Sequence, residues 1–156
     1  MTELIIRVID CWIFRKSPDG LRFLIMKRAS EKLYAGIYHC VHGKIQEGET
    51  AWQAAVREMR EETGLKPSRL WVLDGTSSFY EAKEDRMNMV PVFAAEVETD
   101  IIRHSDEHCS VEWLSIEDAV NKVSWENHKK SLWTLFRMMS DEFKEKKWLE
   151  ISLDER

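Results

Sequence analysis

The chain has 156 residues, of which 44% are hydrophobic and 33% charged, and its formal net charge at pH 7 is −5. This length suits a single domain over residues 1–156 with a hydrophobic core of its own, and the composition is that of an ordinary globular protein. The acidic balance argues against a general nucleic-acid surface and against binding to an anionic membrane.

No signal peptide opens the sequence, and no apolar run approaches the roughly 20 residues that a membrane span needs. The three cysteines lie far apart and show no metal-ligand spacing: Cys11, Cys40 and Cys109. An odd number of cysteines without such spacing favours reduced thiols, so we expect a cytoplasmic protein.

The first part of the chain has the pattern of β-strands. Residues 4–14 (LIIRVIDCWIF) are mostly apolar and β-rich, as in a strand covered on both faces. The turn sequence over residues 17–20 predicts a hairpin whose second strand covers residues 21–26 and ends in two cations, Lys27 and Arg28. A short strand is expected over residues 37–41.

The most distinctive segment follows, GKIQEGETAWQAAVREMREETGL, from Gly43 to Leu65. Thr50 followed by Gln53 is typical of a helix N-cap with a capping box, and Gly64 is typical of a helix C-terminus. The helix between them would carry three carboxylates within about 100° of one another on one face. They are Glu58, Glu61 and Glu62.

Like charges on one helical face repel each other, and a bound divalent cation would reverse the sign of that interaction. Oxygen ligands alone suit magnesium or manganese better than zinc. A solvated acidic face is the plainer alternative. Ala51 and Ala54 lie on the carboxylate face, where small side chains would let a ligand approach. A second face is expected to pack on the core: Trp52, Ala55, Val56, Met59 and Thr63.

The complete pattern is G-x5-E-x7-R-E-U-x-E-E-x-G-U, with U apolar, and it resembles the Nudix box of the Nudix hydrolases at every fixed position. Seven fixed residues at about 7% each coincide by chance on the order of 10⁻⁸ times per starting position. The resemblance implies an α/β Nudix fold, an α/β/α sandwich with a mixed β-sheet between helices. It also implies hydrolysis of a phosphoanhydride with Mg²⁺, for which Mn²⁺ can substitute.

The resemblance further implies a role for each matched position. Glu58 and Glu62 would be the main metal ligands, and Glu61 would be a further ligand, often through water. The carbonyl oxygen of Gly43 would complete the metal site, because a glycine lets the backbone come close to the ion.

Arg57 would orient Glu58, and Glu49 would brace Arg57; an ordinary structural ion pair is the alternative for both. In Nudix relatives an arginine at the place of Arg28 often contacts a substrate phosphate, although two cations at the end of a buried strand usually only mark the exit of the chain to solvent. Lys44 could also meet a phosphate, with a plain surface lysine as the alternative.

The second half of the chain is again rich in strands. Strands are expected over residues 71–73 and 77–80, followed by a charged loop over residues 81–86 and a long apolar strand over residues 87–97. Pro91 inside the last strand implies a sheet edge or a bulge.

Two further features bear on the site. Phe79 or Tyr80 could stack on a nucleobase, although aromatic strand residues more often belong to a core. Residues 107–114, EHCSVEWL, resemble the E-H-x-x-x-x-W-L of Nudix enzymes that act on nucleoside triphosphates and diadenosine polyphosphates. Glu107 would then be a metal ligand or general base outside the box, with a surface acid as the alternative, and His108 is more often structural.

The rest of the chain predicts helices. Ser115 opens a capping signature for a short helix, and a longer helix is expected from Ser124 onward. Its apolar stripe is expected to pack in the core: Leu132, Leu135, Phe136, Met139 and Phe143. The charged residues 144–156 are expected to be peripheral.

Together these features predict attack of water on a phosphoanhydride phosphorus, with a carboxylate accepting the proton. Glu58, Glu61 and Glu107 are the candidates for this base. The favoured substrate is a nucleoside triphosphate, cleaved to monophosphate and pyrophosphate. Diadenosine polyphosphates, nucleotide sugars and ADP-ribose are the alternatives. A non-catalytic nucleotide-binding module is the alternative of a different class, and the intact box argues against it. Nucleic-acid partners are not expected, and a homodimer stays open.

Overall fold

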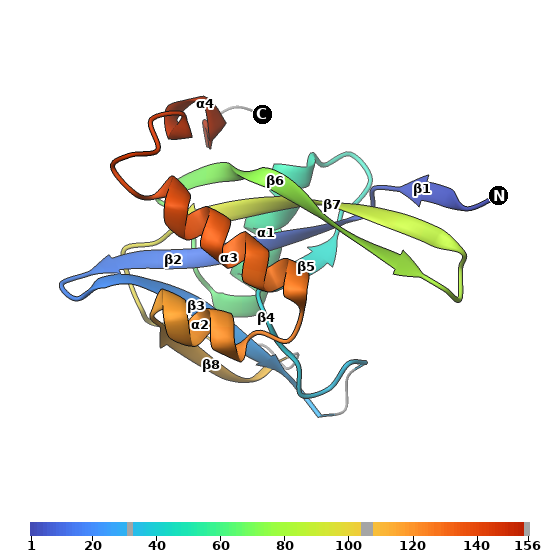
Figure 1. Cartoon of the computed structure of the whole chain (residues 1–156), viewed down its shortest axis with the longest axis horizontal. Coiled ribbons are helices and arrows are strands. Elements are labelled where there is room, and N and C mark those ends of the chain that lie inside the picture. Colours follow the sequence, from blue (N-terminus) through green and yellow to red (C-terminus); the bar gives the residue numbers. More distant parts are fainter. Residues whose placement is uncertain (31–32, 104–107, 155–156) are drawn as a thin grey trace.

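The structure is a computed structural model that describes residues 1–30, 33–103 and 108–154. The strands are β1 (Glu3–Ile5), β2 (Val8–Ser17), β3 (Gly20–Arg28), β4 (Tyr38–His39), β5 (Val41–Lys44), β6 (Arg69–Glu81), β7 (Arg86–Glu96), β8 (His108–Leu114) and β9 (Glu150–Ile151). The helices are α1 (Ala51–Thr63), α2 (Ile116–Lys122), α3 (Glu126–Met138) and α4 (Lys146–Leu149). Over these described residues the strands form one sheet with the order β4-β3-β2-β7-β6-β9, in which β1 pairs with β7, β5 with β2, and β8 with β3 (Figure 1).

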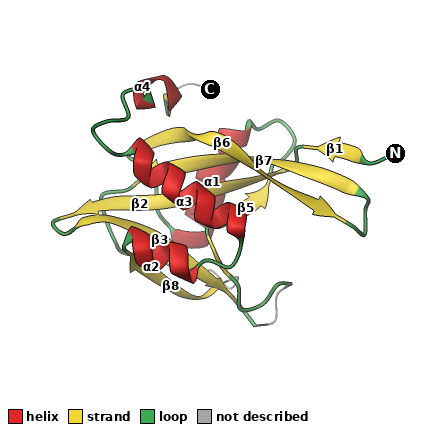
Figure 2. Cartoon of the chain, viewed as in Figure 1, coloured by secondary structure: helices red, strands yellow, loops and turns green. Residues whose placement is uncertain are grey.

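The sheet is mixed and lies between helices, as predicted. Strands β1 and β2 both run parallel to β7, and the other pairs are antiparallel. Helices α2 and α3 cover one face and α1 covers the other (Figure 2). Side chains alternate along β2: Trp12 and Phe14 pack in the cluster beneath α2 and α3, while Cys11 and Ile13 pack in the cluster beneath α1. The α/β/α sandwich is therefore confirmed.

The strand predicted over residues 4–14 is divided in two. Ile6 and Arg7 separate β1 from β2, and each part forms its own parallel ladder with β7. Arg7 lies between the two ladders, and its guanidinium pairs with Glu81 at 3.1 Å. The hairpin after β2 forms as predicted, with Ser17 opposite Gly20.

Helix α1 begins and ends where its capping residues predicted. The Thr50 hydroxyl accepts a hydrogen bond from the Gln53 amide at 3.2 Å, and the Gln53 side chain accepts one from the Thr50 amide at 2.9 Å. Gly64 ends the helix in the left-handed conformation, with φ of 76°, and its amide donates to the Arg60 carbonyl.

One detail of the predicted helix faces is wrong. Ala54 was expected beside the carboxylates as an open position, but it is fully buried in the core beneath α1. The buried stripe of this helix is therefore wider than the predicted face. Ala55, Met59 and Thr63 are buried as predicted, and Trp52 is partly buried.

The two strands predicted over residues 71–73 and 77–80 are one strand, β6, with an irregular register between Val72 and Thr76. Pro91 lies opposite Thr76 at this irregularity, so the predicted bulge is confirmed. On the other side of β7 the ladder to β1 ends at Asn88 and the ladder to β2 starts at Val92. The missing N–H of proline therefore falls at interruptions in both ladders.

The helices near the C-terminus partly match the prediction. Ser115 caps α2 by accepting a hydrogen bond from the Asp118 amide, and Leu132 and Leu135 of α3 are buried in the core. Phe136 was predicted in the same stripe, but it is 39% exposed, and Met138 is buried in its place.

The charged residues 144–156 were expected to be peripheral, but part of this segment joins the sheet. Helix α4 leads into β9, whose Ile151 lies opposite Leu70 at the free edge of β6. Glu150 accepts two hydrogen bonds from Arg69, at 2.6 and 3.0 Å, and these fix the added strand. None of the helices in the described part of the chain is long and apolar enough to cross a membrane.

Candidate active site

The candidate site starts at the contact between β5 and α1. Gly43 lies in β5 opposite Ile9 of β2 and faces the helix. A Cβ atom at this position would collide with Cγ and Cδ of Glu58. Only glycine therefore lets the Glu58 carboxylate lie directly against the strand backbone. The role of the Gly43 carbonyl as a metal ligand stays a prediction.

Arg57 connects the acidic residues of this segment. Its Nη1 atom donates to Glu58 Oε1 at 2.8 Å and to Glu61 Oε2 at 3.2 Å. Its Nη2 atom donates to Glu49 Oε1 at 2.6 Å and to the Lys44 carbonyl at 2.8 Å, and its Nε atom donates to Glu49 Oε2 at 3.1 Å. Both carboxylate oxygens of Glu49 thus face the guanidinium. These hydrogen bonds lower the pKa of Glu49 and raise that of Arg57.

The three carboxylates of the helix face differ in exposure. The side chain of Glu62 is 3% exposed, that of Glu58 is 15% exposed, and that of Glu61 is 57% exposed. The carboxylate of Glu62 is therefore almost completely buried, whereas that of Glu61 reaches solvent. Such an all-oxygen set on one face fits a hard divalent cation.

Beside Glu62 lies a pair of buried histidines that the sequence did not single out as a pair. Glu62 Oε1 is 3.6 Å from His108 Nε2, which is 3.2 Å from His39 Nε2. The pairing of β3 with both β4 and β8 brings these rings together. No local sequence signal joins them, because the two residues are 69 positions apart.

The buried histidine pair predicts acid sensitivity. Burial, reinforced by nearby His108, lowers the pKa of His39 from 6.5 to about 3. The folded state then binds fewer protons than the unfolded state below pH 6.5, so stability falls as the pH drops toward 3. Between pH 7 and pH 5 we expect this group alone to cost about 2 kcal/mol.

Urea unfolding of the wild type and of His39→Gln at the two pH values measures this contribution. The variant should lose about 2 kcal/mol less than the wild type between pH 7 and pH 5. An equal loss in both proteins would show that His39 is not the acid-sensitive group.

The other predicted site residues that the structure describes lie outside helix α1. Arg28 ends β3, opposite His108, and its Nε atom donates to the Leu33 carbonyl at 2.7 Å. Lys44 follows Gly43 and has an exposed side chain. Tyr80 lies on the β6–β7 hairpin, where its hydroxyl donates to Asp85 at 2.6 Å. Glu107 lies outside the described residues, so its role stays a prediction.

A second group of polar side chains lies on the other face of the sheet, and sequence reasoning missed it. Among the described residues, Asp10, Cys40 and His128 form the one set of three His, Cys, Asp or Glu side chains whose ligand atoms lie within 4.8 Å of one another. The box carboxylates do not form such a set. An aspartate inside the apolar segment VIDCWIF is the sequence signal that was available.

The layered fold, the capped helix and the Glu58 carboxylate in contact with Gly43 together indicate the class of Nudix-fold proteins. The NUDIX domain model matches residues 5–135, so the chain belongs to this family. Relatives that it resembles bear the names Nudix hydrolase 6 and asymmetrical bis(5'-nucleosyl)-tetraphosphatase, so the family is that of the Nudix hydrolases. Members of the family generally use a divalent metal ion.

Several known proteins are similar to this chain. Nudix hydrolase 6 of Arabidopsis thaliana is 34% identical over 112 residues, which are 68% of this chain and 36% of that protein. The chain thus spans about a third of the length of that relative. The asymmetrical bis(5'-nucleosyl)-tetraphosphatase of Rattus norvegicus is 30% identical over 117 residues, or 72% of this chain and 76% of that protein. A NUDIX hydrolase structure from Listeria monocytogenes superposes with a TM-score of 0.75 at 21% identity, covering 87% of this chain and 95% of that one, which supports the fold.

Proposed function

We propose that this protein is a Mg²⁺-dependent hydrolase that cleaves a phosphoanhydride bond of a nucleoside polyphosphate. The first candidate substrate is a nucleoside triphosphate, which would yield the monophosphate and pyrophosphate. The observation that carries the proposal is the single guanidinium of Arg57, which holds Glu49, Glu58 and Glu61 around the close contact between Gly43 and α1.

The donor set suits the proposed ion. Glu58, Glu61, Glu62 and the Gly43 carbonyl supply oxygen atoms only, and these would hold Mg²⁺ or, in its place, Mn²⁺. When bound, the ion would shield the charge on the attacked and leaving oxygens and activate the attacking water.

The side chains of this site would have separate roles in the reaction. Arg57 fixes Glu58 through the 2.8 Å hydrogen bond, and Glu49 in turn fixes Arg57 with both of its oxygens. Such positioning holds the catalytic side chains in place, so that they do not need to reorganise during the reaction. Glu61 is the most exposed of the box carboxylates and can reach water, which suits a general base. Glu58 and Glu107 stay candidates for the same role.

Substrate contacts are proposed for three further side chains. Arg28 and Lys44 carry positive charge beside the proposed metal site and would contact substrate phosphates. Tyr80 has a half-exposed ring on the β6–β7 hairpin, which would stack on a nucleobase.

Diadenosine tetraphosphate is the second candidate substrate. The rat relative, whose name states asymmetrical bis(5'-nucleosyl)-tetraphosphatase activity, shares 30% identity over 72% of this chain. Nucleotide sugars and ADP-ribose stay further alternatives within the same chemistry. A non-catalytic nucleotide-binding role is the alternative of another class.

One substrate panel tests these candidates. The four deoxynucleoside triphosphates, diadenosine tetraphosphate, ADP-ribose and a nucleotide sugar are incubated with protein in Mg²⁺ or in EDTA, and products are resolved by chromatography. We expect pyrophosphate and monophosphate from a triphosphate, with the rate falling by at least about 10³-fold in EDTA. Cleavage of the dinucleotide alone would establish the second candidate. A protein that binds nucleotide and cleaves none of the panel would contradict an enzymatic role.

Two further properties are proposed with this function. The chain acts as a single domain over residues 1–156, and its location is cytoplasmic, in keeping with free thiols at Cys11 and Cys40. A homodimer stays open, and light scattering would decide it.

A further inference from the structure

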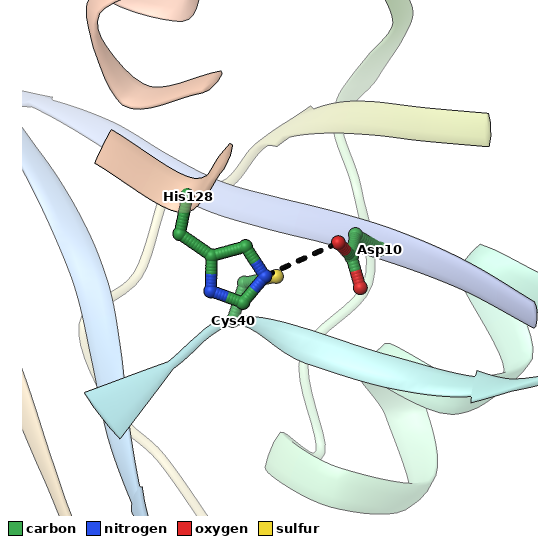
Figure 3. A group of neighbouring side chains, drawn as sticks. All are labelled: Asp10, Cys40 and His128. Atoms are coloured by element: carbon green, nitrogen blue, oxygen red, sulfur yellow. Dashed lines mark hydrogen bonds and ion pairs between the residues drawn. The ribbon is translucent and has the colours of Figure 1, made fainter. Parts of the chain in front are cut away.

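The buried group of Asp10, Cys40 and His128 lies on the face of the sheet opposite α1. Asp10 projects from β2, Cys40 lies between β4 and β5, and His128 projects from the first turn of α3. Figure 3 shows the carboxylate, the sulfur and the imidazole turned toward one another. All three residues are buried, with residue exposures of 4%, 1% and 9%. The mechanism proposed above uses none of them.

We propose that Asp10, Cys40 and His128 bind a transition-metal ion of the zinc class, at a site separate from the Nudix box. The chemistry of the donors leads to this class of ion. Sulfur, imidazole nitrogen and carboxylate oxygen are the ligand types that zinc accepts together, whereas magnesium takes oxygen alone.

The distances suit such an ion. Zinc bonds of about 2.0–2.3 Å place neighbouring ligand atoms of a tetrahedral site roughly 3.3–3.8 Å apart. His128 Nε2 and Asp10 Oδ2 are 3.3 Å apart, and all three ligand atoms lie within 4.8 Å of one another. The Cys40 sulfur lies within 4.8 Å of the other two ligand atoms and would move closer to them when the ion binds. The fourth position is left to water, as in zinc sites with three protein ligands.

Neighbouring residues hold the proposed metal ligands in place. His42 Nδ1 lies 2.7 Å from Asp10 Oδ1, so the carboxylate keeps one oxygen in a fixed hydrogen bond while the other faces His128. Outer hydrogen bonds of this kind orient metal ligands. The side chain of His42 is 41% exposed, so the hydrogen-bond partner of Asp10 reaches solvent. Trp12 meets the His128 ring edge-on, with ring centroids 5.3 Å apart, and limits its rotation.

Binding needs no redox partner. The Cys40 thiol releases its proton to solvent as the sulfur–metal bond forms. His128 would bind as the neutral imidazole, with its ring proton moved from Nε2 to Nδ1, so that Nε2 and the ionised carboxylate of Asp10 each donate a lone pair. One proton is therefore released for each ion bound.

Cobalt is the probe that separates this site from the box. The protein is freed of metal with a chelator, exchanged into metal-free buffer and titrated with Co²⁺. A cysteine thiolate bound to Co²⁺ gives a sulfur-to-metal charge-transfer band in the near ultraviolet, and a carboxylate-only site gives none. We expect this band to saturate at one ion per chain and to disappear when Zn²⁺ displaces the cobalt.

Cysteine variants provide matched controls. Cys40→Ser should abolish the band, whereas Cys11→Ser should keep it, because Cys11 is equally buried but packs on the α1 face of the sheet. Cys109→Ser should also keep it. Zinc at one hundred times its dissociation constant should raise the Tm of the wild type by about 5–10 °C. It should raise the Tm of Cys11→Ser equally and that of His128→Gln less.

The wild-type titration decides the proposal even where a variant does not fold. No charge-transfer band in the wild type would overturn the proposal and leave these residues as a hydrogen-bonded network. A band that persists in Cys40→Ser would overturn it as well. Neither result depends on hydrolysis, so the outcome is independent of the function proposed above.

Discussion

Glu58→Gln should lower kcat/KM by about 10³-fold without unfolding the protein. Glutamine has the same shape as glutamate, and its amide oxygen can still accept the 2.8 Å hydrogen bond from Arg57. What is lost is the negative charge that the proposed Mg²⁺ site needs. Metal stabilisation of the transition state is worth several kcal/mol, and each 1.36 kcal/mol corresponds to about tenfold in rate.

The measurement compares kcat/KM of wild type and variant at saturating Mg²⁺, on whichever substrate the panel identifies. Glu117→Gln is a matched control, since Glu117 is exposed on α2, and it should keep wild-type activity. Glu62→Gln tests the buried end of the same set and should also lose most activity. Full activity in Glu62→Gln would show that the metal-site assignment is wrong.

Gly43→Ala should impair both activity and stability, although it adds only one methyl group. The new Cβ atom would overlap Cγ and Cδ of Glu58, so either the strand or the carboxylate must move. A displacement of about 1 Å at a reacting centre costs on the order of 10²-fold in rate. Overpacking of this kind also costs about 1–3 kcal/mol of stability, or roughly 2–10 °C in Tm for a chain of this size.

A double-mutant cycle assigns this effect to the contact itself. Thermal unfolding is measured for Gly43→Ala, Glu58→Ala and the double variant. Once the Glu58 side chain is shortened, the alanine at position 43 meets open space, and its destabilisation should largely vanish. If Gly43→Ala destabilises the protein equally in both backgrounds, strand geometry and not the Glu58 contact is responsible.

The features that could be predicted from the sequence depend on residues that lie close together in the chain. The caps of α1 depend on residues three positions apart, and the box depends on a fixed spacing within 23 residues, so Thr50 and Gln53 could be assigned without tertiary information. The hairpin at residues 17–20 follows from turn chemistry in the same way.

The parts that were missed depend on contacts between distant segments. Asp10, Cys40 and His128 come from three different elements and are joined only by the sheet and α3. Nothing in the charged tail predicts that Ile151 would pair with Leu70, because the open edge of β6 exists only in the folded sheet. The exposure of Phe136 likewise depends on how α3 rests on the sheet and not on helical spacing.

The alternation of side chains along the short strand β5 limits the insertions and deletions that this segment can tolerate. His42 points to the α3 face, where it bonds Asp10, while its neighbour Gly43 points to the α1 face, against Glu58. Insertion or deletion of a single residue before β5 would exchange the two faces, because side chains alternate along a strand. One such event would place a histidine against Glu58 and remove the bond to Asp10. We therefore expect no insertions or deletions directly before β5, whereas the exposed turn at residues 17–20 can accommodate them.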